Sequence, residues 1–367
     1  MQALTFIDKF LTFVLTLGFL VFIHELGHFA IAKLFRVPVF EFAFGLPFGP
    51  KIRLFRRGGT DYTLRPMVPL GGFVAFADPE ASEEDQLDQM EQYHQKPVWQ
   101  RFLVILAGPL ASLWLGWMLF VWFAGMYGIE SGNPILKQVV ANKPAAVAGL
   151  KAGDEVLAVN GDNVPQSAFV DRLSLSAGRP ITLKIRRAGT AEPLSFTLTP
   201  REEFIEKQRV GRIGVVVGGS ERRAVSSPRE AFSEGSRLTS EYLKNLKNVF
   251  SSFRTAKESV GGPVGIASAV SQATEIGFPA KLMLAAQLSL GLFVFNCFIP
   301  VPALDCGQMV LLVIEAIRRR RLSIEQQSKV MIGSWAFLLV FVLFATFNDI
   351  TRLLPTPAPR TSPPPAK

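Results

Sequence analysis

The stretch FLVFIHELGHFAIAKLF, residues 19 to 35, places two histidines and a glutamate inside an apolar run. An ionisable side chain at bilayer depth costs at least about 2.5 kcal/mol, so such residues usually belong to a functional site. The chain contains three histidines in total, and two of them, His24 and His28, lie in this run. The stretch therefore predicts a membrane helix that carries a site.

Four apolar stretches are long enough to cross the membrane as helices, and they cover roughly residues 8 to 33, 102 to 129, 282 to 317 and 330 to 347. The third is too long for one regular helix. Pro300 and Pro302 are expected to break it, because proline removes a backbone hydrogen bond and clashes with the preceding turn. The composition agrees with a membrane protein, since 49% of the residues are hydrophobic and 31 are phenylalanine.

Orientation follows from the basic residues near the ends of these stretches. Arg318 to Arg321 and Lys329 lie in or beside the short loop between the third and fourth stretches, and such loops stay in the cytoplasm. Four spans then place both termini and the long segment 130 to 280 outside the cytoplasm. We attribute the net charge of +9 to this topology and to an ordinary basic domain. Nucleic-acid binding is not expected, because the sequence has no basic stripe interleaved with aromatic residues.

The polar residues of the first span have the spacing of a metal site. His24 and His28 are four residues apart, so they share one helix face, with Glu25 beside them. In H-E-x-x-H sites two neutral imidazoles hold zinc, and the glutamate takes a proton from water at the metal. A catalytic zinc needs a third protein ligand, and Asp305 is the only acid in the third apolar run before Glu315. The alternatives are histidines that hydrogen-bond between helices and an aspartate that caps a helix.

Five elements, in order along nearly the whole chain, resemble the site-2 protease family of intramembrane zinc metalloproteases, in its bacterial PDZ-containing branch. They are HELGH for H-E-x-G-H, LGGFV at Leu70 to Val74 for G-G-[FY]-V, FLVILAGPLAS for A-G-P-x-x-N, GGPVGI at Gly261 to Ile266, and PVPALDCG for P-x-P-x-L-D-G.

The resemblance implies a bacterial inner-membrane enzyme that cleaves transmembrane segments of other proteins. It implies one Zn2+ per chain, held by His24, His28 and Asp305, with Glu25 as the general base. Expected substrates are membrane-tethered anti-sigma factors already cut outside the membrane, or remnant signal peptides. The segment outside the cytoplasm, with both termini, would then be periplasmic.

Two departures from the family pattern concern substrate binding. The asparagine of A-G-P-x-x-N is Ser112 here, and the asparagine that the family has eight positions before the metal aspartate is Cys297. Asn296, one residue earlier, is expected to hold the substrate backbone or polarise its carbonyl after a local shift. The further candidates for substrate binding are Gly71, Gly72 and Phe73.

We therefore predict an α-helical polytopic membrane protein with four transmembrane helices, a membrane-associated β-hairpin region and one inserted PDZ domain (α+β, mainly β). Residues 36 to 76 are aromatic, β-prone and punctuated by glycine, which predicts hairpins that the resemblance implies re-enter the membrane. PAAVAGLKAGDEVLAVNG resembles the core of a PDZ domain. The predicted boundaries are 1–35 for the first span, 36–97 for the β-loop and an acidic loop, 98–129 for the second span, 130–202 for the PDZ domain, 203–280 for a linker and amphipathic helix, 281–317 for the third span, 318–329 for a basic loop, 330–350 for the fourth span and 351–367 for a disordered tail.

The predicted partners are transmembrane protein substrates, a peptide or protein ligand of the PDZ domain, and the lipid bilayer. Two other functions remain open on the sequence alone. One is a non-catalytic membrane scaffold whose PDZ domain does the work, although the complete set of His24, Glu25, His28 and Asp305 argues against it. The other is a metal transporter, which would need further ligands inside the membrane, and the sequence offers none of comparable quality.

Overall fold

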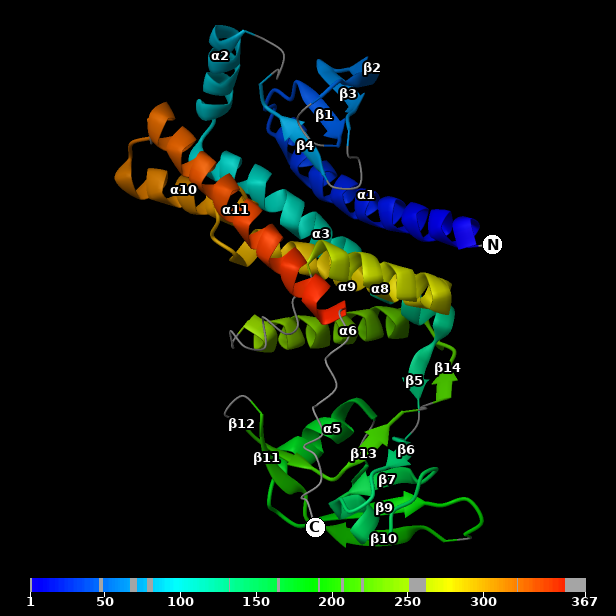
Figure 1. Cartoon of the computed structure of the whole chain (residues 1–367). Helices are drawn as coiled ribbons and strands as arrows, with labels where there is room; N and C mark the ends of the chain where they lie inside the picture. The colour runs from blue at the N-terminus through cyan, green and yellow to red at the C-terminus, as the bar shows by residue number, and fades with distance from the viewer. Residues whose placement is uncertain are drawn as a thin grey trace, which may run out of the picture. The chain divides into compact units, whose positions relative to one another are not determined.

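The computed structural model (Figure 1) describes residues 2–45, 49–66, 71–77, 82–131, 133–163, 166–190, 192–205, 208–218, 221–250, 262–321 and 323–353. The chain divides into two compact units. The first, Met1–Phe120 with Gly235–Lys367, is called the membrane unit below. The second, Val121–Glu234, is called the inserted unit.

The long apolar stretches form helices of the length that a bilayer requires. Among the described residues, four helices are long and apolar enough to cross a membrane, with spans at Ile7–Leu34, Val98–Tyr127, Phe278–Phe298 and Lys329–Thr351. The prediction of four such helices is confirmed by length and composition. The helices that lie wholly or partly in the membrane unit are α1 (Gln2–Leu34), α2 (Glu83–His94), α3 (Val98–Tyr127), α6 (Pro228–Phe250), α8 (Pro263–Ile276), α9 (Phe278–Phe298), α10 (Asp305–Arg318) and α11 (Ile324–Leu353).

The third apolar stretch breaks where its prolines predict. Helix α9 ends at Phe298 and α10 begins at Asp305, and the residues between them, which include Pro300 and Pro302, are not helical. The third candidate span is therefore α9 alone, which is shorter than the predicted third span. The break places Asp305 at the first residue of a separate helix. The direction of its side chain is therefore set by α10 and not by α9.

A four-stranded sheet follows the first span, as the predicted hairpins require. Its strands are β1 (Glu41–Phe44), β2 (Ile52–Arg57), β3 (Thr60–Leu64) and β4 (Gly72–Ala75), in the order β2-β3-β1-β4. Gly58 and Gly59 make the two-residue turn between β2 and β3 with φ of +56° and +78°, which suits the left-handed backbone of this turn. Strand β4 packs along α1, the helix that carries HELGH (Figure 1).

A buried aspartate accounts for the glycines of the GGPVGI segment. Gly261 of this segment lies outside the described residues. Asp349 of α11 is 4% exposed and accepts hydrogen bonds from the backbone N–H groups of Gly262, at 3.1 Å, and Gly265, at 2.6 Å. These groups open helix α8, whose first N–H groups have no partner within the helix. A Cβ atom on Gly262 would lie 2.9 Å from the Asp349 carboxylate, so the close approach requires glycine there.

The inserted unit is built mainly from short strands around an apolar core. Strand β9 shows the pattern, since Ile181, Leu183 and Ile185 are buried and the residues between them are exposed. These side chains pack with Phe169 of α5 and Leu136 of β6. The elements are β5 (Ile129–Ser131), β6 (Leu136–Val139), α4 (Pro144–Val147), β7 (Glu155–Val159), β8 (Asp162–Asn163), α5 (Gln166–Leu175), β9 (Ile181–Arg186), β10 (Leu194–Leu198), β11 (Arg201–Ile205), β12 (Gln208–Arg212), β13 (Val215–Val217) and β14 (Glu221–Arg223), and one sheet has the order β10-β9-β7-β8.

The inserted unit extends beyond residue 202, where the sequence predicted that a linker begins. Strands β11 to β14 occupy most of the segment from 201 to 223. Val215 of β13 pairs with Val139 of β6, and Ile213 is 2% exposed in the core. The structure thus has paired strands where the sequence predicted a linker, because pairing between strands so far apart in sequence leaves no local signal. The helix predicted after it is α6, and residues 354–367 of the predicted tail lie outside the described residues.

Asp154→Asn is expected to destabilise the inserted unit by about 2–3 kcal/mol. The Asp154 side chain is fully buried and accepts two hydrogen bonds of 2.7 Å from Arg187 and one of 2.8 Å from the Lys151 backbone. Burial alone would raise the pKa of Asp154, but these hydrogen bonds lower it below its usual value. The native state then binds fewer protons than the unfolded chain, so this stability is present above about pH 4 and is lost as the pH falls below it.

Hydrogen exchange of strands β7 and β9 in the full chain measures this effect. The difference between wild type and Asp154→Asn should shrink as the pH falls through about 4. Asp162→Asn is the matched control, because Asp162 and its partner Arg172 are 66% and 46% exposed. Exposed pairs contribute about 0–1 kcal/mol. Equal effects of the two substitutions would show that the buried Asp154–Arg187 pair stabilises the inserted unit no more than the exposed Asp162–Arg172 pair does.

Candidate metal centre

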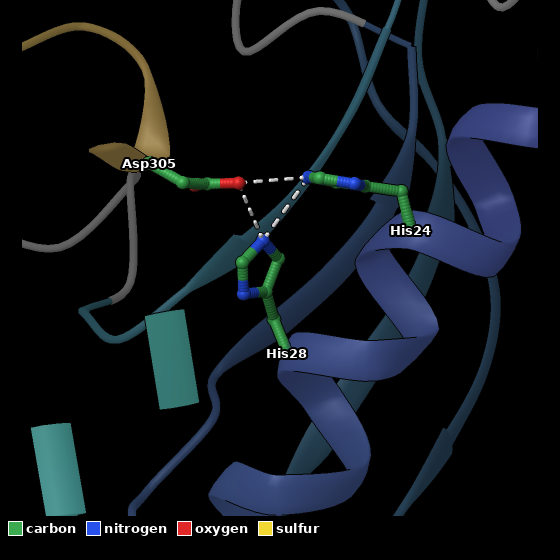
Figure 2. A group of neighbouring side chains, drawn as sticks. All are labelled: His24, His28 and Asp305. Carbon is green, nitrogen blue, oxygen red and sulfur yellow. Dashed lines mark hydrogen bonds and ion pairs between the residues drawn. The ribbon is translucent and has the colours of Figure 1, made fainter. Parts of the chain in front are cut away.

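His24, His28 and Asp305 converge in the membrane unit (Figure 2). The Nε2 atoms of His24 and His28 are 3.3 Å apart. The Oδ2 atom of Asp305 lies 3.0 Å from Nε2 of His24 and 3.5 Å from Nε2 of His28. Among the described residues, these form the one group of three or more possible metal ligands whose donor atoms all lie within 4.8 Å of one another. The two histidines are 6% and 8% exposed, so the group is screened from bulk solvent.

Two separate elements bring these side chains together. The regular helix α1 stacks His24 and His28 on one face, with ring centroids 4.9 Å apart. Asp305 opens α10, and Leu304 before it is extended, with φ of −104° and ψ of 160°. A carboxylate in the first turn of a helix is favoured by the helix dipole. The proline break in the third apolar stretch therefore lets Asp305 point toward α1 and its two histidines.

Helix α3 fixes the orientation of both imidazoles. Nδ1 of His28 donates to the Val104 carbonyl at 2.8 Å, and Nδ1 of His24 lies 3.0 Å from Oγ of Ser112. Ser112 is fully buried, and its own carbonyl accepts a hydrogen bond of 2.8 Å from Ser289 Oγ. With Nδ1 protonated and engaged, each neutral ring presents the lone pair of Nε2 to the centre of the group. The sequence carries no signal for Val104, and it presents Ser112 only as a departure from a family motif.

The three donor atoms suit a metal with the ligand preferences of zinc. Two neutral imidazole nitrogens that face each other at 3.3 Å repel, and a cation between them removes that repulsion. Ligand atoms about 2.0–2.1 Å from a tetrahedral centre are about 3.3–3.4 Å apart, and the observed separations of 3.0, 3.3 and 3.5 Å bracket that value. Two nitrogens and one carboxylate oxygen favour zinc over calcium or magnesium, which prefer oxygen ligands.

Glu25 lies beside this group and next to strand β4. Its carboxylate interacts electrostatically with both histidines and with Asp305. A Cβ atom on Gly72 would lie only 3.2 Å from Cγ of Glu25, so β4 passes directly by this side chain. The strand that the sequence proposed for substrate binding is therefore adjacent to the residue that it proposed as the base.

The other predicted substrate-binding residues take different positions. Asn296 is buried in α9, where its Nδ2 donates to the Leu292 carbonyl at 3.1 Å, and it is not part of the three-residue group. The Gly71 carbonyl accepts from the Gly45 N–H at 2.9 Å. The Arg65 guanidinium lies 5.6 Å from the Phe73 ring centroid. Leu70 lies outside the described residues.

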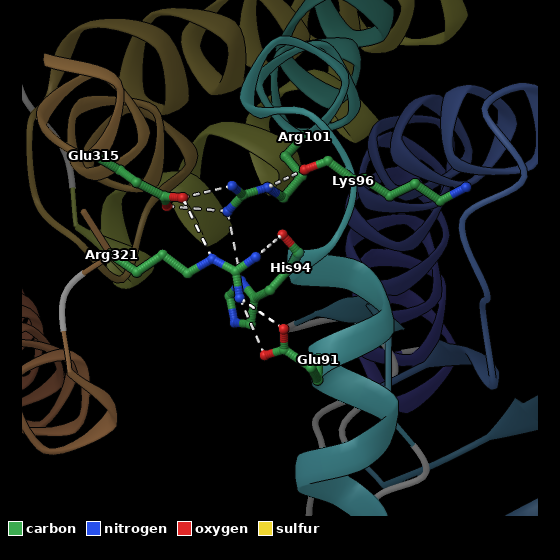
Figure 3. A network of polar contacts seen from close by, with 6 residues as sticks. All are labelled: Glu91, His94, Lys96, Arg101, Glu315 and Arg321. Atoms are coloured by element: carbon green, nitrogen blue, oxygen red, sulfur yellow. Dashed lines mark hydrogen bonds and ion pairs between the residues drawn. The ribbon is translucent and has the colours of Figure 1, made fainter. Parts of the chain in front are cut away.

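A network of charged residues holds the far end of α10 (Figure 3). Arg101 of α3 is 2% exposed and donates to both carboxylate oxygens of Glu315, at 3.1 and 2.6 Å. Arg321, just after α10, donates to Glu91 of α2 at 2.9 and 3.1 Å and to the His94 carbonyl at 2.5 Å. Helix α10 is thus tied to α2 and α3 at the end opposite Asp305.

Comparison with known proteins agrees with this arrangement. Residues 12–341 match peptidase family M50. The regulator of sigma-W protease RasP of Bacillus subtilis is 29% identical, over 95% of this chain and 99% of its own. The zinc metalloprotease RasP of Geobacillus kaustophilus is 28% identical, over 94% and 98%. A protein of Agrobacterium fabrum, provisionally named zinc metalloprotease Atu1380, is 33% identical over 93% and 95%.

A solved PDZ domain, from the SdrC-like protein of Listeria monocytogenes, aligns with 24% of this chain and 90% of its own at 19% identity. Its TM-score of 0.21 is too low to assign a fold to the inserted unit. The family match and the full-length relatives confirm the resemblance seen in the sequence, with Zn2+ as the cofactor and the membrane as the location. The chain belongs to peptidase family M50 and is an intramembrane zinc metalloendopeptidase.

Proposed function

We propose that His24, His28 and Asp305 hold the zinc and that Glu25 acts first as general base and then as proton donor. The observation that carries this assignment is the spacing of 3.0–3.5 Å among the three donor atoms. The fixed Nδ1 partners support it, because they leave both Nε2 atoms available to a metal. A structural cluster of histidines and a capping aspartate would not need this mutual orientation.

The reaction is the hydrolysis of a peptide bond in or near a transmembrane segment of another protein. Zinc at this position supplies Lewis-acid chemistry, which acidifies water and polarises a carbonyl. Glu25 accepts a proton from the attacking water as the new carbon–oxygen bond forms. It then donates that proton to the amide nitrogen as the carbon–nitrogen bond breaks, which restores the carboxylate. The low exposure of the histidines limits the water that reaches the bond.

Strand β4 presents the substrate in this proposal. It is an edge of the sheet β2-β3-β1-β4, and Gly72 lies beside Glu25. An extended peptide that pairs with β4 would run past the base with its backbone hydrogen bonds satisfied. A transmembrane helix must unwind locally to do so, because its carbonyl groups are otherwise bonded within the helix. Gly71, Gly72 and Phe73 would contact this peptide directly, and Asn296 remains a candidate for its carbonyl.

The proposed location rests on the positive-inside rule, and the proposed substrates rest on the relatives. We place the chain in a bacterial inner membrane, with the basic loop that follows α10 in the cytoplasm and both termini and the inserted unit in the periplasm. The inserted unit would be a PDZ domain that binds a peptide or protein ligand. One relative is named a regulator of sigma-W protease, which favours membrane-tethered anti-sigma factors already cut outside as substrates. Remnant signal peptides are the second substrate class.

Removal of zinc is expected to abolish cleavage of a model transmembrane substrate, and added zinc is expected to restore it. Purified enzyme should hold one zinc per chain before treatment with a chelator and none after. Activity and metal content, measured on the same samples, should fall and recover together. Cleavage that continues once the zinc is gone would contradict the proposed chemistry.

Ser112→Ala is expected to weaken zinc binding by about 10- to 100-fold, because His24 loses the partner of its Nδ1 atom. Competition with a chelator of known affinity measures this effect independently of activity. Ser289→Ala is the matched control, since this buried hydroxyl contacts the Ser112 carbonyl and not the imidazole. If both variants bind zinc equally well, the Ser112 hydroxyl does not position His24.

A further inference from the structure

The β2–β3 hairpin has an exposed edge that the proposed reaction does not use. All six residues of β2 are exposed, and Ile52, Leu54 and Phe55 are 62%, 55% and 53% exposed. Strand β2 is the edge of its sheet opposite β4. An exposed edge strand with several large apolar side chains is a docking surface or an aggregation hazard, so a stable protein must cover it.

A β-bulge gathers apolar side chains of β2 on one face. Ile52 pairs with Leu64 and Phe55 pairs with Tyr62. Since Leu64 and Tyr62 are two residues apart on β3, Ile52 and Phe55 lie on the same face although they are three residues apart. The irregularity in register between Arg53 and Phe55 makes this possible, because an extra residue resets the alternation.

The same register places basic side chains on the opposite face. Arg53 pairs with Thr63 and Arg56 pairs with Asp61. The side chains of Arg53 and Arg56 are 58% and 63% exposed, and they share the single carboxylate of Asp61 at 3.8 and 3.5 Å. Residues 51 to 64 contain four basic residues and one acidic residue, so the hairpin carries a net positive charge.

Contacts with α1 place the hairpin at the end of the first span. Lys33 is the penultimate residue of the span Ile7–Leu34, and its Nζ donates to the Gly58 carbonyl at the hairpin turn at 3.2 Å. One helical turn earlier, the Phe29 ring lies 5.9 Å from the Tyr62 ring. The end of an apolar span marks the boundary between hydrocarbon and headgroups, where basic side chains meet phosphates. The contacts of the hairpin with the end of this span therefore predict that it lies at headgroup level.

We propose that the β2–β3 hairpin binds anionic phospholipid headgroups. Its basic residues would pair with the phosphates, because a guanidinium matches phosphate in charge and geometry. Its exposed apolar residues would enter the adjoining acyl region. The basic set is Arg53 and Arg56 together with Arg57, which pairs with Thr60 beside the hairpin turn and so lies on the face of Phe55. The apolar set is Ile52, Leu54 and Phe55. Since β4 forms the opposite edge of this sheet beside Glu25, bound lipid would also hold the proposed substrate-binding edge at a fixed depth.

Hydrogen exchange of the full-length protein in nanodiscs tests the proposal. Discs of phosphatidylcholine are compared with discs that also contain phosphatidylglycerol. We expect exchange of residues 51–64 to slow several-fold in the anionic discs, since each arginine near an anionic surface contributes roughly fivefold to binding. Residues 181–186 of the inserted unit should exchange equally in both. Added salt should reduce the difference by screening.

Two matched variants test whether the effect of anionic lipid depends on the positive charge of the hairpin or on its folding. Replacing Arg53, Arg56 and Arg57 together by Gln should remove the difference between the two kinds of disc, and replacing all three by Lys should retain it. Unchanged exchange of residues 98–127 in α3 shows that each variant is folded. Equal exchange of the wild-type hairpin in both discs overturns the proposal. Protection that arises only when a substrate protein is added also overturns it, because the edge would then be a protein-docking surface.

Discussion

Glu25→Gln should lower kcat for cleavage of a transmembrane substrate by about 10²- to 10⁴-fold and leave one zinc per chain in place. Glutamine keeps the size of the side chain but cannot accept a proton from water or return it to the leaving nitrogen. Both histidines and Asp305 are expected to keep the spacing of 3.0–3.5 Å that they have in the wild type, so the proposed zinc ligands should be unaffected. The substitution therefore separates proton transfer from metal binding.

Asp305→Ala provides the contrasting result. It removes the oxygen that lies 3.0 and 3.5 Å from the two Nε2 atoms, so zinc content and activity should both be lost. Cleavage rate and zinc content are measured on wild type and both variants with the same substrate. A Glu25→Gln enzyme that lacks zinc would make Glu25 a ligand. One that cleaves at the wild-type rate would remove it from the mechanism.

The candidate site was largely predictable because its signals are local or chemically rare. Two histidines four residues apart with an adjacent glutamate are a pattern typical of zinc sites, and an apolar run seldom retains such residues without a function. This pattern identified His24, His28 and Glu25. Asp305 was found because so few acids lie in the apolar stretches. The structure brings His24, His28 and Asp305 within hydrogen-bonding distance, as the sequence interpretation requires, and their role as zinc ligands stays a proposal.

The parts that the sequence did not reveal depend on contacts between distant segments. Strand β13 completes the inserted unit by pairing with β6, and no local periodicity signals that partnership. The orienting bonds from Val104 and Ser112 depend on how α1 and α3 cross, and a backbone carbonyl such as that of Val104 has no sequence signature. Asn296 lies one residue before the family position, and its side-chain nitrogen donates to a carbonyl of its own helix, so its role toward the substrate stays a prediction.

The close crossing of α1 and α3 depends on two glycines. A Cβ atom on Gly27 would lie 2.4 Å from the Ala107 carbonyl oxygen, and one on Gly108 would lie 2.2 Å from Nε2 of His28. Distances this short cannot be tolerated, so an added methyl group must move a helix or a ring. The atom displaced at Gly108 is Nε2 of His28, the nitrogen proposed to bind zinc. The glycine of the A-G-P element, Gly108, is thus explained by the close approach of His28 to α3.

Gly108→Ala is therefore expected to abolish zinc binding and cleavage. The methyl group would occupy the position of the His28 ring edge, and the His28–Val104 hydrogen bond of 2.8 Å prevents the ring from moving away without loss of its orientation. Gly125→Ala is the matched control in the same helix, because a Cβ atom there has no neighbour within 4 Å. Zinc content and cleavage are measured on both, with helix content by circular dichroism to show that each is folded.

A Gly108→Ala protein that binds zinc as tightly as the wild type would mean that α1 and α3 do not cross at this distance. Loss of zinc in a folded Gly108→Ala protein, with Gly125→Ala unaffected, would show that the second span shapes the metal site although it supplies none of the proposed ligands.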